Sequence, residues 1–219
     1  MIPKVLHFIW FGGRDFPALE TKCIESWKKY LPDYEIKRWD ETNYTSDDPG
    51  FAKAFAKKQW AFCADYARLD LLVKHGGVYL DTDVELVKSF DPFLEHQCFV
   101  GMESEQYMGC AIIGAQPGDP FMKDCLEEVR ASLLKDFIPM PKIFQYVYEN
   151  NSFPSLTVYS RDYFYPYNPY AYPIKNLMFS DLTENTHAIH HWNYSWRPTV
   201  PERIVAKVKR VISKNKFIK

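Results

Sequence analysis

The sequence lacks several features that would place it in a special class of protein. No stretch approaches the roughly 18 apolar residues of a membrane-spanning helix, and the apolar start at 5–11 is interrupted by His7 and has no signal-peptide cleavage site. The nearest two of five cysteines, Cys98 and Cys110, are too far apart for a zinc ribbon or redox pair. Scattered cysteines of this kind indicate reduced thiols and a cytoplasmic protein.

An excess of one charge is also missing. The 27 Lys and Arg residues nearly balance the 28 Asp and Glu residues, so composition gives no reason to expect a nucleic-acid partner. Hydrophobic residues make up 47% of the chain and aromatic residues 17%, which is enough for a packed core. A length of 219 residues suits one domain with a small appendage.

Hydrophobic periodicity predicts strands that alternate with helices. The expected strands cover 4–10, 34–39, 78–80, 99–102, 110–115 and 187–194, and the expected helices cover 19–30, 51–75, 120–134 and 141–149. Residues 151–173 are dense in Tyr, Pro and Asn and predict a long irregular loop. The alternation predicts an α/β domain over residues 1–200, with a single, mostly parallel central sheet and flanking helices.

Residues 201–219 predict a separate, basic amphipathic helix at the C-terminus. Ile204, Val208 and Val211 follow helical spacing, while basic residues such as Lys207 and Arg210 occupy another face. Such a helix suits peripheral contact with an anionic membrane, close to a lipid-linked acceptor. It equally suits a terminal helix that packs on the domain and exposes its basic side to water.

Two carboxylates, Asp81 and Asp83, follow directly after a short buried strand. Strand alternation would place them on the same side, with Glu85 as a third candidate. Open α/β sheets bind ligands outside the carboxyl ends of their strands. Adjacent carboxylates repel each other unless a cation lies between them, and oxygen ligands suit Mg²⁺ or Mn²⁺. The alternative is an acidic strand end that faces water.

Other uses of this D-x-D pattern fit less well. An EF-hand that begins at Asp81 needs Gly at 86 and Glu at 92, where the chain has Leu86 and Pro92. A phosphohydrolase with Asp81 as its nucleophile is weakened by Glu85, because such enzymes often have Thr or Val there. This Mg²⁺-dependent phosphohydrolase and a non-catalytic carbohydrate-binding protein remain the alternative functions.

A charged pair lies on the helix that precedes these carboxylates. Asp65 and Arg68 are three residues apart and therefore share a helix face. Their neighbours are apolar almost all round, which predicts a buried helix, and a buried pair of charges needs a reason beyond surface solubility.

Three ordered blocks resemble glycosyltransferase family 32, the sugar transferases with a D-x-D motif. The blocks read "IPKVLHFIWFGG", "ADYARLDLLVKHGGVYLDTD" and "AIHHWNYSWRP". The resemblance implies a GT-A, Rossmann-like nucleotide-sugar-binding fold. It also implies a metal-dependent, retaining transferase that moves a hexose from a nucleotide sugar, with a UDP-sugar favoured, to a saccharide acceptor. The expected setting is the synthesis of a bacterial surface or capsular polysaccharide.

The resemblance also assigns roles to residues that would bind the donor. Trp10 matches the aromatic residue that stacks on the donor base. The pair Asp65 and Arg68 matches positions that contact the ribose and the transferred sugar, and Asp81 matches a residue that bonds the ribose or the sugar. Ser195 and Trp196 match the C-terminal block near the diphosphate. Gly109 and Cys110 stand where the family often has Asn, which leaves the identity of the sugar open.

The metal ligands implied by the resemblance are Asp83, with Asp81 beside it, and a histidine from the C-terminal block. The candidates are His190 and His191, which face opposite sides if their strand is extended, so only one reaches the ion. We expect His190. A histidine ligand among oxygen ligands favours Mn²⁺ over Mg²⁺.

Overall fold

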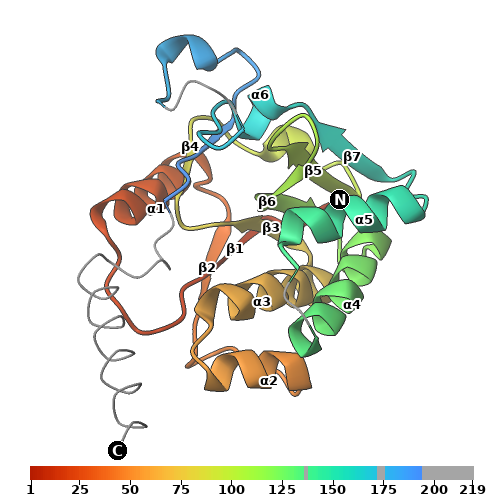
Figure 1. The fold of residues 1–219 in the computed structure, drawn as a ribbon. Coiled ribbons are helices and arrows are strands. Elements are labelled where there is room, and N and C mark those ends of the chain that lie inside the picture. Colours follow the sequence, from red (N-terminus) through yellow and green to blue (C-terminus); the bar gives the residue numbers. More distant parts are fainter. Residues whose placement is uncertain (136–137, 172–175, 194–219) are drawn as a thin grey trace, which may run out of the picture.

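The computed structural model describes residues 1–135, 138–171 and 176–193. Figure 1 shows a central sheet with helices on both faces. The expected helix at 201–219 lies outside the described residues, as do Ser195 and Trp196. In the described part of the chain, no helix is both long and apolar enough to cross a membrane.

The central sheet has six strands in the order β2-β1-β3-β6-β5-β7. These strands are β1 (Val5–Ile9), β2 (Glu35–Trp39), β3 (Gly77–Leu80), β5 (Cys98–Met102), β6 (Met108–Ala115) and β7 (Leu156–Tyr159). β1 runs parallel to β2 and β3, and β5 runs parallel to β7, whereas β6 is antiparallel to both of its neighbours. The predicted α/β fold with a mostly parallel sheet is confirmed.

A second, two-stranded sheet was not predicted. It pairs β4 (Val84–Leu86) antiparallel with β8 (Ala188–His190). Each of these strands has three residues, too few for alternation to reveal them in the sequence. Among the described residues 187–193 of the expected strand, only those of β8 form a strand.

Helices cover the sheet on both faces. They are α1 (Ala18–Tyr30), α2 (Pro49–Ala56), α3 (Trp60–His75), α4 (Pro120–Leu134), α5 (Met140–Asn150) and α6 (Arg161–Phe164), with short 3₁₀ turns η1 (Asp91–Phe93) and η2 (Phe179–Asp181). One core joins α2, α3, α4 and α5 to the sheet, and the other joins α1, the β4–β8 pair and α6 to the opposite face.

The single helix expected at 51–75 was wrong, because the chain forms two helices there. Asp48 caps α2 by accepting a hydrogen bond from Phe51 N at 2.9 Å, and Lys58 interrupts the helix with a φ of 55°. This break brings the rings of Phe55 and Trp60 together at 5.4 Å. Apolar residues continue through the break, so periodicity alone did not reveal it.

The irregular loop expected at 151–173 was also wrong in part, since β7 and α6 lie within it. β7 pairs with β5 at the edge of the sheet, with Val158 opposite Val100. That pairing partner lies more than fifty residues away in the sequence, so the local density of Tyr and Pro hid the strand.

A tight turn delivers the chain from α3 directly into β3. Gly76 and Gly77 have φ angles of 64° and 99°, in the left-handed region that favours glycine. A Cβ atom on Gly77 would also lie 2.5 Å from Val5 O. The turn sets β3 beside β1 and brings Asp81 to the carboxyl end of the sheet.

Candidate active site

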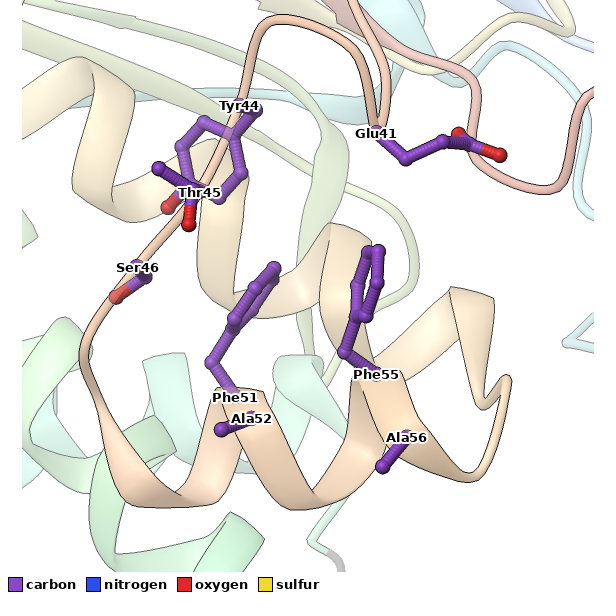
Figure 2. Close-up of a pocket in the computed structure, with 8 residues that line it drawn as sticks. All are labelled: Glu41, Tyr44, Thr45, Ser46, Phe51, Ala52, Phe55 and Ala56. Atoms are coloured by element: carbon purple, nitrogen blue, oxygen red, sulfur yellow. The ribbon is translucent and has the colours of Figure 1, made fainter.

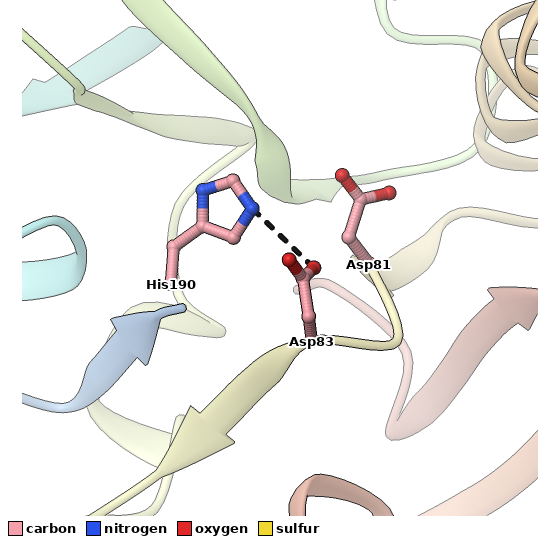
Figure 3. A group of neighbouring side chains, drawn as sticks. All are labelled: Asp81, Asp83 and His190. Carbon is pink, nitrogen blue, oxygen red and sulfur yellow. Dashed lines mark ion pairs between the residues drawn. The ribbon is translucent and has the colours of Figure 1, made fainter. Parts of the chain in front are cut away.

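Asp81 and Asp83 lie in a turn and not on an extended strand. β3 ends at Leu80, Asp81 N donates to Ala111 O at 2.8 Å, and Val84 N donates to Asp81 O at 3.1 Å as β4 begins. The expected strand alternation therefore does not operate here. The turn nonetheless brings both carboxylates toward one point, where His190 joins them (Figure 3).

Three side chains form a candidate metal centre, which we name the Asp–Asp–His group: Asp81, Asp83 and His190. One ligand atom from each residue lies within 4.8 Å of the others. His190 arrives through the pairing of β4 with β8, in which Val84 lies opposite His190. Its Nε2 atom is 3.3 Å from Asp83 Oδ1.

His191 and Glu85 lie apart from this group. His191 Nε2 is 2.8 Å from Glu85 Oε2, and the two residues pair with each other. His191 follows the last residue of β8, and its backbone N–H donates to Asp83 O at 3.0 Å while its side chain contacts Glu85. The structure thus brings one of the two candidate histidines to the carboxylates.

The electrostatics of the Asp–Asp–His group suit a cation. Burial alone would raise the pKa of Asp83, but His190 and the backbone N–H of Asn193 lower it below the ordinary value. Burial disfavours the charged form of His190, yet Asp83, Asp81 and Glu103 raise its pKa. Two carboxylates and one imidazole are a donor set that Mn²⁺ or Mg²⁺ accepts. The residues present therefore fit a divalent ion.

Arg68 lies beside this group and connects it to α3. Its guanidinium is 2.9 Å from Asp65 Oδ1 and 3.2 Å from Asp81 Oδ1, and it donates to Cys110 O at 2.7 Å. The side chain is only 8% exposed and lies over the Tyr79 ring at 4.7 Å. Burial raises the pKa of Asp65 to about 6, although Arg68 opposes that shift. The structure contains the predicted Asp65–Arg68 pair on a buried helix, and Asp81 is a second carboxylate partner of Arg68.

Trp10 lies on the loop that follows β1. Because β1 and β3 are parallel neighbours, Trp10 and Asp81 follow strands that end at the same edge of the sheet. The indole Nε1 donates to Arg14 O at 2.7 Å, and the ring packs against Phe16 at 4.8 Å. Trp10 is half-buried. Its ring is thus oriented by its own loop.

Several residues of the site were not found from the sequence. Tyr79 donates to Asp81 Oδ1 at 2.7 Å, and only its position two residues earlier in the sequence hinted at this contact. Burial raises the pKa of Glu103 to about 7, and its carboxylate interacts electrostatically with His190 and Asp81. Asn193 N donates to Asp83 Oδ2 at 2.7 Å. Long-range folding brings Glu103 and Asn193 to the site, so no local pattern marks them.

A separate pocket of about 340 Å³ lies between α2 and the segment 41–46 (Figure 2). Phe51 and Phe55 rise from α2 toward Tyr44, and Glu41 lies at the rim. Glu41 also accepts hydrogen bonds from Gly12 N at 3.0 and 3.2 Å. The pocket therefore borders the loop after β1, but none of its lining residues belongs to the Asp–Asp–His group.

Residues 17–100 match the family described as the glycosyltransferase sugar-binding region containing DXD motif. The match includes α1, the Asp65–Arg68 pair and the two carboxylates Asp81 and Asp83. Two residues of the Asp–Asp–His group, Asp81 and Asp83, lie within the matched range, whereas His190 lies outside it.

Two proteins with similar sequences are named as glycosyltransferases. The inositol phosphoceramide mannosyltransferase 3 of Schizosaccharomyces pombe is 29% identical over 126 residues, which cover 55% of this chain and 35% of that protein. The uncharacterized glycosyltransferase L373 of Acanthamoeba polyphaga mimivirus is 27% identical, over all of this chain and 90% of its own length. The chain thus spans about a third of the yeast protein but most of the viral one.

A solved structure supports the fold. The galactosyltransferase LgtC, in complex with donor and acceptor sugar analogues, superimposes with a TM-score of 0.54 over 90% of this chain and 91% of its own. The sequence identity is 12%, so the likeness concerns the fold alone. The GT-A fold is confirmed, and the family match and the named relatives support a transferase enzyme.

Proposed function

Since residues 17–100 carry the DXD-containing sugar-binding region of the glycosyltransferases, we propose that this chain moves a hexose from a nucleotide sugar to a saccharide acceptor. In this proposal the reaction depends on a divalent ion, the anomeric configuration is retained, and the donor is a UDP-sugar. One observation carries the proposal. Asp81, Asp83 and His190 converge at the carboxyl end of β3, beside the buried pair of Asp65 and Arg68.

The Asp–Asp–His group would hold the ion, Mn²⁺ or Mg²⁺, through carboxylate oxygens and His190 Nε2. When bound, such an ion offsets the negative charge that develops on a departing nucleoside diphosphate. His190 would act as a ligand only with Nε2 deprotonated, so we expect metal binding to weaken as the pH falls.

Arg68 supplies the fixed positive charge of the proposed site. Its contacts with Asp65, Asp81 and Cys110 O hold the guanidinium in one orientation before a donor arrives. Such preorganised charge costs little reorganisation during the reaction. The two carboxylates can also accept hydrogen bonds from the hydroxyl groups of a ribose or a hexose. Stacking of Trp10 on the base, and contacts of Ser195 and Trp196 with the diphosphate, remain predictions from the family resemblance.

The acceptor in this proposal is a saccharide or a lipid-linked saccharide. Support for a lipid-linked acceptor comes from the name of the yeast relative, an inositol phosphoceramide mannosyltransferase. Peripheral membrane contact through the basic residues of 201–219, on the cytoplasmic side, would suit such an acceptor. Full-length protein should then co-sediment with anionic vesicles, and a Lys207→Glu/Arg210→Glu variant should lose this binding. Equal sedimentation of both proteins would reject the contact. A role in bacterial surface or capsular polysaccharide stays a prediction.

A thermal-shift screen of UDP- and GDP-sugars with Mn²⁺ tests the central proposal. A ligand at 100 times its Kd stabilises the native state by about 2.7 kcal/mol, which raises the unfolding temperature measurably. We expect one nucleotide sugar to stabilise the protein only with Mn²⁺ and to be hydrolysed slowly without an acceptor. The Asp83→Asn variant should lose both effects, whereas Asp33→Asn, at an exposed position, should keep them. Unchanged Mn²⁺-dependent nucleotide binding in Asp83→Asn would refute the proposed role.

A further inference from the structure

Glu20 is a buried carboxylate that the proposed reaction does not use. It lies in the first turn of α1, and its exposed fraction is 0%. Its Oε1 atom accepts a hydrogen bond from Asn193 Nδ2 at 2.9 Å, whereas Oε2 has no hydrogen-bond partner among the described residues. Burying a carboxylate with one oxygen unpaired costs free energy, so its burial calls for an explanation.

The position of Glu20 in its helix does not supply that explanation. The N-terminal turn of a helix favours a negative charge, because the backbone N–H groups there are unpaired. An exposed carboxylate in the same turn would gain this benefit without the cost of burial. The direction of the side chain, toward Asn193, is therefore the feature to explain.

Asn193 connects Glu20 to the Asp–Asp–His group. Its side chain donates to Glu20, while its backbone N–H donates to Asp83 Oδ2 at 2.7 Å. The same short segment holds the backbone of Asp83, since His191 N donates to Asp83 O at 3.0 Å. One residue thus bridges α1 and a carboxylate of the candidate metal centre.

This bridge determines how Asp83 presents its oxygens. With Oδ2 engaged by Asn193 N, the other oxygen, Oδ1, faces His190 Nε2 at 3.3 Å. α1 is a rigid support for this arrangement, because Trp27 Nε1 donates to Val84 O at 2.6 Å directly after Asp83. Groups that hold metal ligands in orientation commonly change metal affinity by about 10–100-fold when removed.

We propose that Glu20 is a positioning residue for the metal centre: it holds Asn193, whose backbone N–H fixes the rotation of the Asp83 carboxylate. The proposal rests on the proposed metal-dependent function. Glu20 also adds a negative charge close to the site. Burial raises the pKa of Cys23 to about 12, and Glu85, Asp83 and Glu20 add to that rise, so these carboxylates share one neighbourhood.

Titration of the full-length protein with Mn²⁺ alone, followed by the electron paramagnetic resonance signal of the free ion, tests the proposal. We expect Glu20→Ala and Asn193→Ala each to weaken Mn²⁺ binding about tenfold. The double variant should have the same Mn²⁺ affinity as the more affected of the two single variants, because both changes break the same connection. Glu20→Gln keeps an oxygen that accepts from Asn193 and should restore binding. Glu25→Ala, at an exposed position of the same helix, is the control.

Three outcomes would overturn the proposal: wild-type Mn²⁺ affinity in Glu20→Ala, additive losses in the double variant, or a Glu20→Gln variant as weak as Glu20→Ala. If Glu20→Ala does not fold, Asn193→Ala carries the same test, because Asn193 is exposed. Asp83→Asn distinguishes a failure of the positioning role from a failure of the metal centre. Loss of Mn²⁺ binding there, with no effect at Glu20, would refute only the positioning role, whereas retained binding in Asp83→Asn would refute the metal centre itself.

Discussion

The indole Nε1 of Trp39 donates a hydrogen bond to Nδ1 of His7 at 3.0 Å, between the adjacent strands β2 and β1. On the other side of the ring, His7 Nε2 lies 2.9 Å from Gly76 O, so Nε2 carries the proton. Both nitrogens of a neutral imidazole are thus satisfied in a fully buried position. Protonation of Nδ1 would place its N–H group opposite the N–H group of Trp39, and neither could accept a hydrogen bond.

This relationship predicts that acid destabilises the protein. Burial lowers the pKa of His7 to about 4, although the bond to Gly76 opposes the shift. In the unfolded chain the pKa is about 6.5, so between these values the unfolded state binds more protons and stability falls as pH falls. We expect this residue to contribute a loss of about 3 kcal/mol in the free energy of unfolding between pH 7 and pH 4.

Urea unfolding at several pH values measures this loss. Asp65 and Glu103 have raised pKa values and act in the opposite direction, so the relevant quantity is the difference between the wild type and His7→Gln. That difference should shrink as the pH falls from about 6.5 to 4. Lys22→Gln, at an exposed position of α1, should track the wild type. A difference that does not change with pH would contradict the prediction.

The two neighbouring histidines provide a matched pair of variants. His190 faces Asp83, and His191 pairs with Glu85. We expect His190→Ala to weaken Mn²⁺ binding by at least about tenfold, because it removes a proposed ligand. His191→Ala should leave that affinity unchanged. Isothermal titration of the full-length protein with Mn²⁺ and UDP measures both, and the reverse order would show that the other histidine is the ligand.

Replacement of Arg68 should affect both stability and donor binding. Arg68→Met leaves Asp65 and Asp81 without their cation in a buried place, which costs about 3–5 kcal/mol. Arg68→Lys keeps the charge but cannot reach both carboxylates and Cys110 O together, so it should fold yet bind a nucleotide sugar weakly. Arg130→Met is the control, because Arg130 forms a more exposed pair with Glu127. Thermal unfolding and a nucleotide-sugar titration give the two readouts.

Tyr165 should stabilise an irregular part of the sheet. The register between β5 and β6 shifts between Val100 and Met102, and the Tyr165 hydroxyl accepts hydrogen bonds from Ala111 N and Ile112 N at 3.1 Å each. Tyr165→Phe leaves these buried N–H groups short of a partner, which should lower the free energy of unfolding by about 1–3 kcal/mol.

The control for this variant is Tyr163→Phe, since Tyr163 is half-buried and packs mainly through its ring against Tyr159. Equal stability of the two variants in denaturant unfolding would show that the Tyr165 hydroxyl does not support the sheet.

Local features of the sequence were sufficient for the main elements. Helix α4 begins and ends where its periodicity predicted. Its start is marked locally, because Asp119 caps the helix and Pro120 is its first residue. The D-x-D carboxylates follow a strand that is buried throughout, and the pair on α3 is enclosed as its apolar neighbours required. Capping, periodicity and the burial of these segments depend on residues that lie close together in the sequence. The sequence alone therefore carries this information.

The tertiary structure decided which residues meet. The choice of His190 over His191 depends on the register of β4 against β8, and Asn193, at the far end of the described chain, connects Glu20 to Asp83. Strand β7 likewise exists because β5 offers it a partner. These contacts join segments many tens of residues apart, and their geometry comes from sheet register and helix packing, which no local pattern encodes.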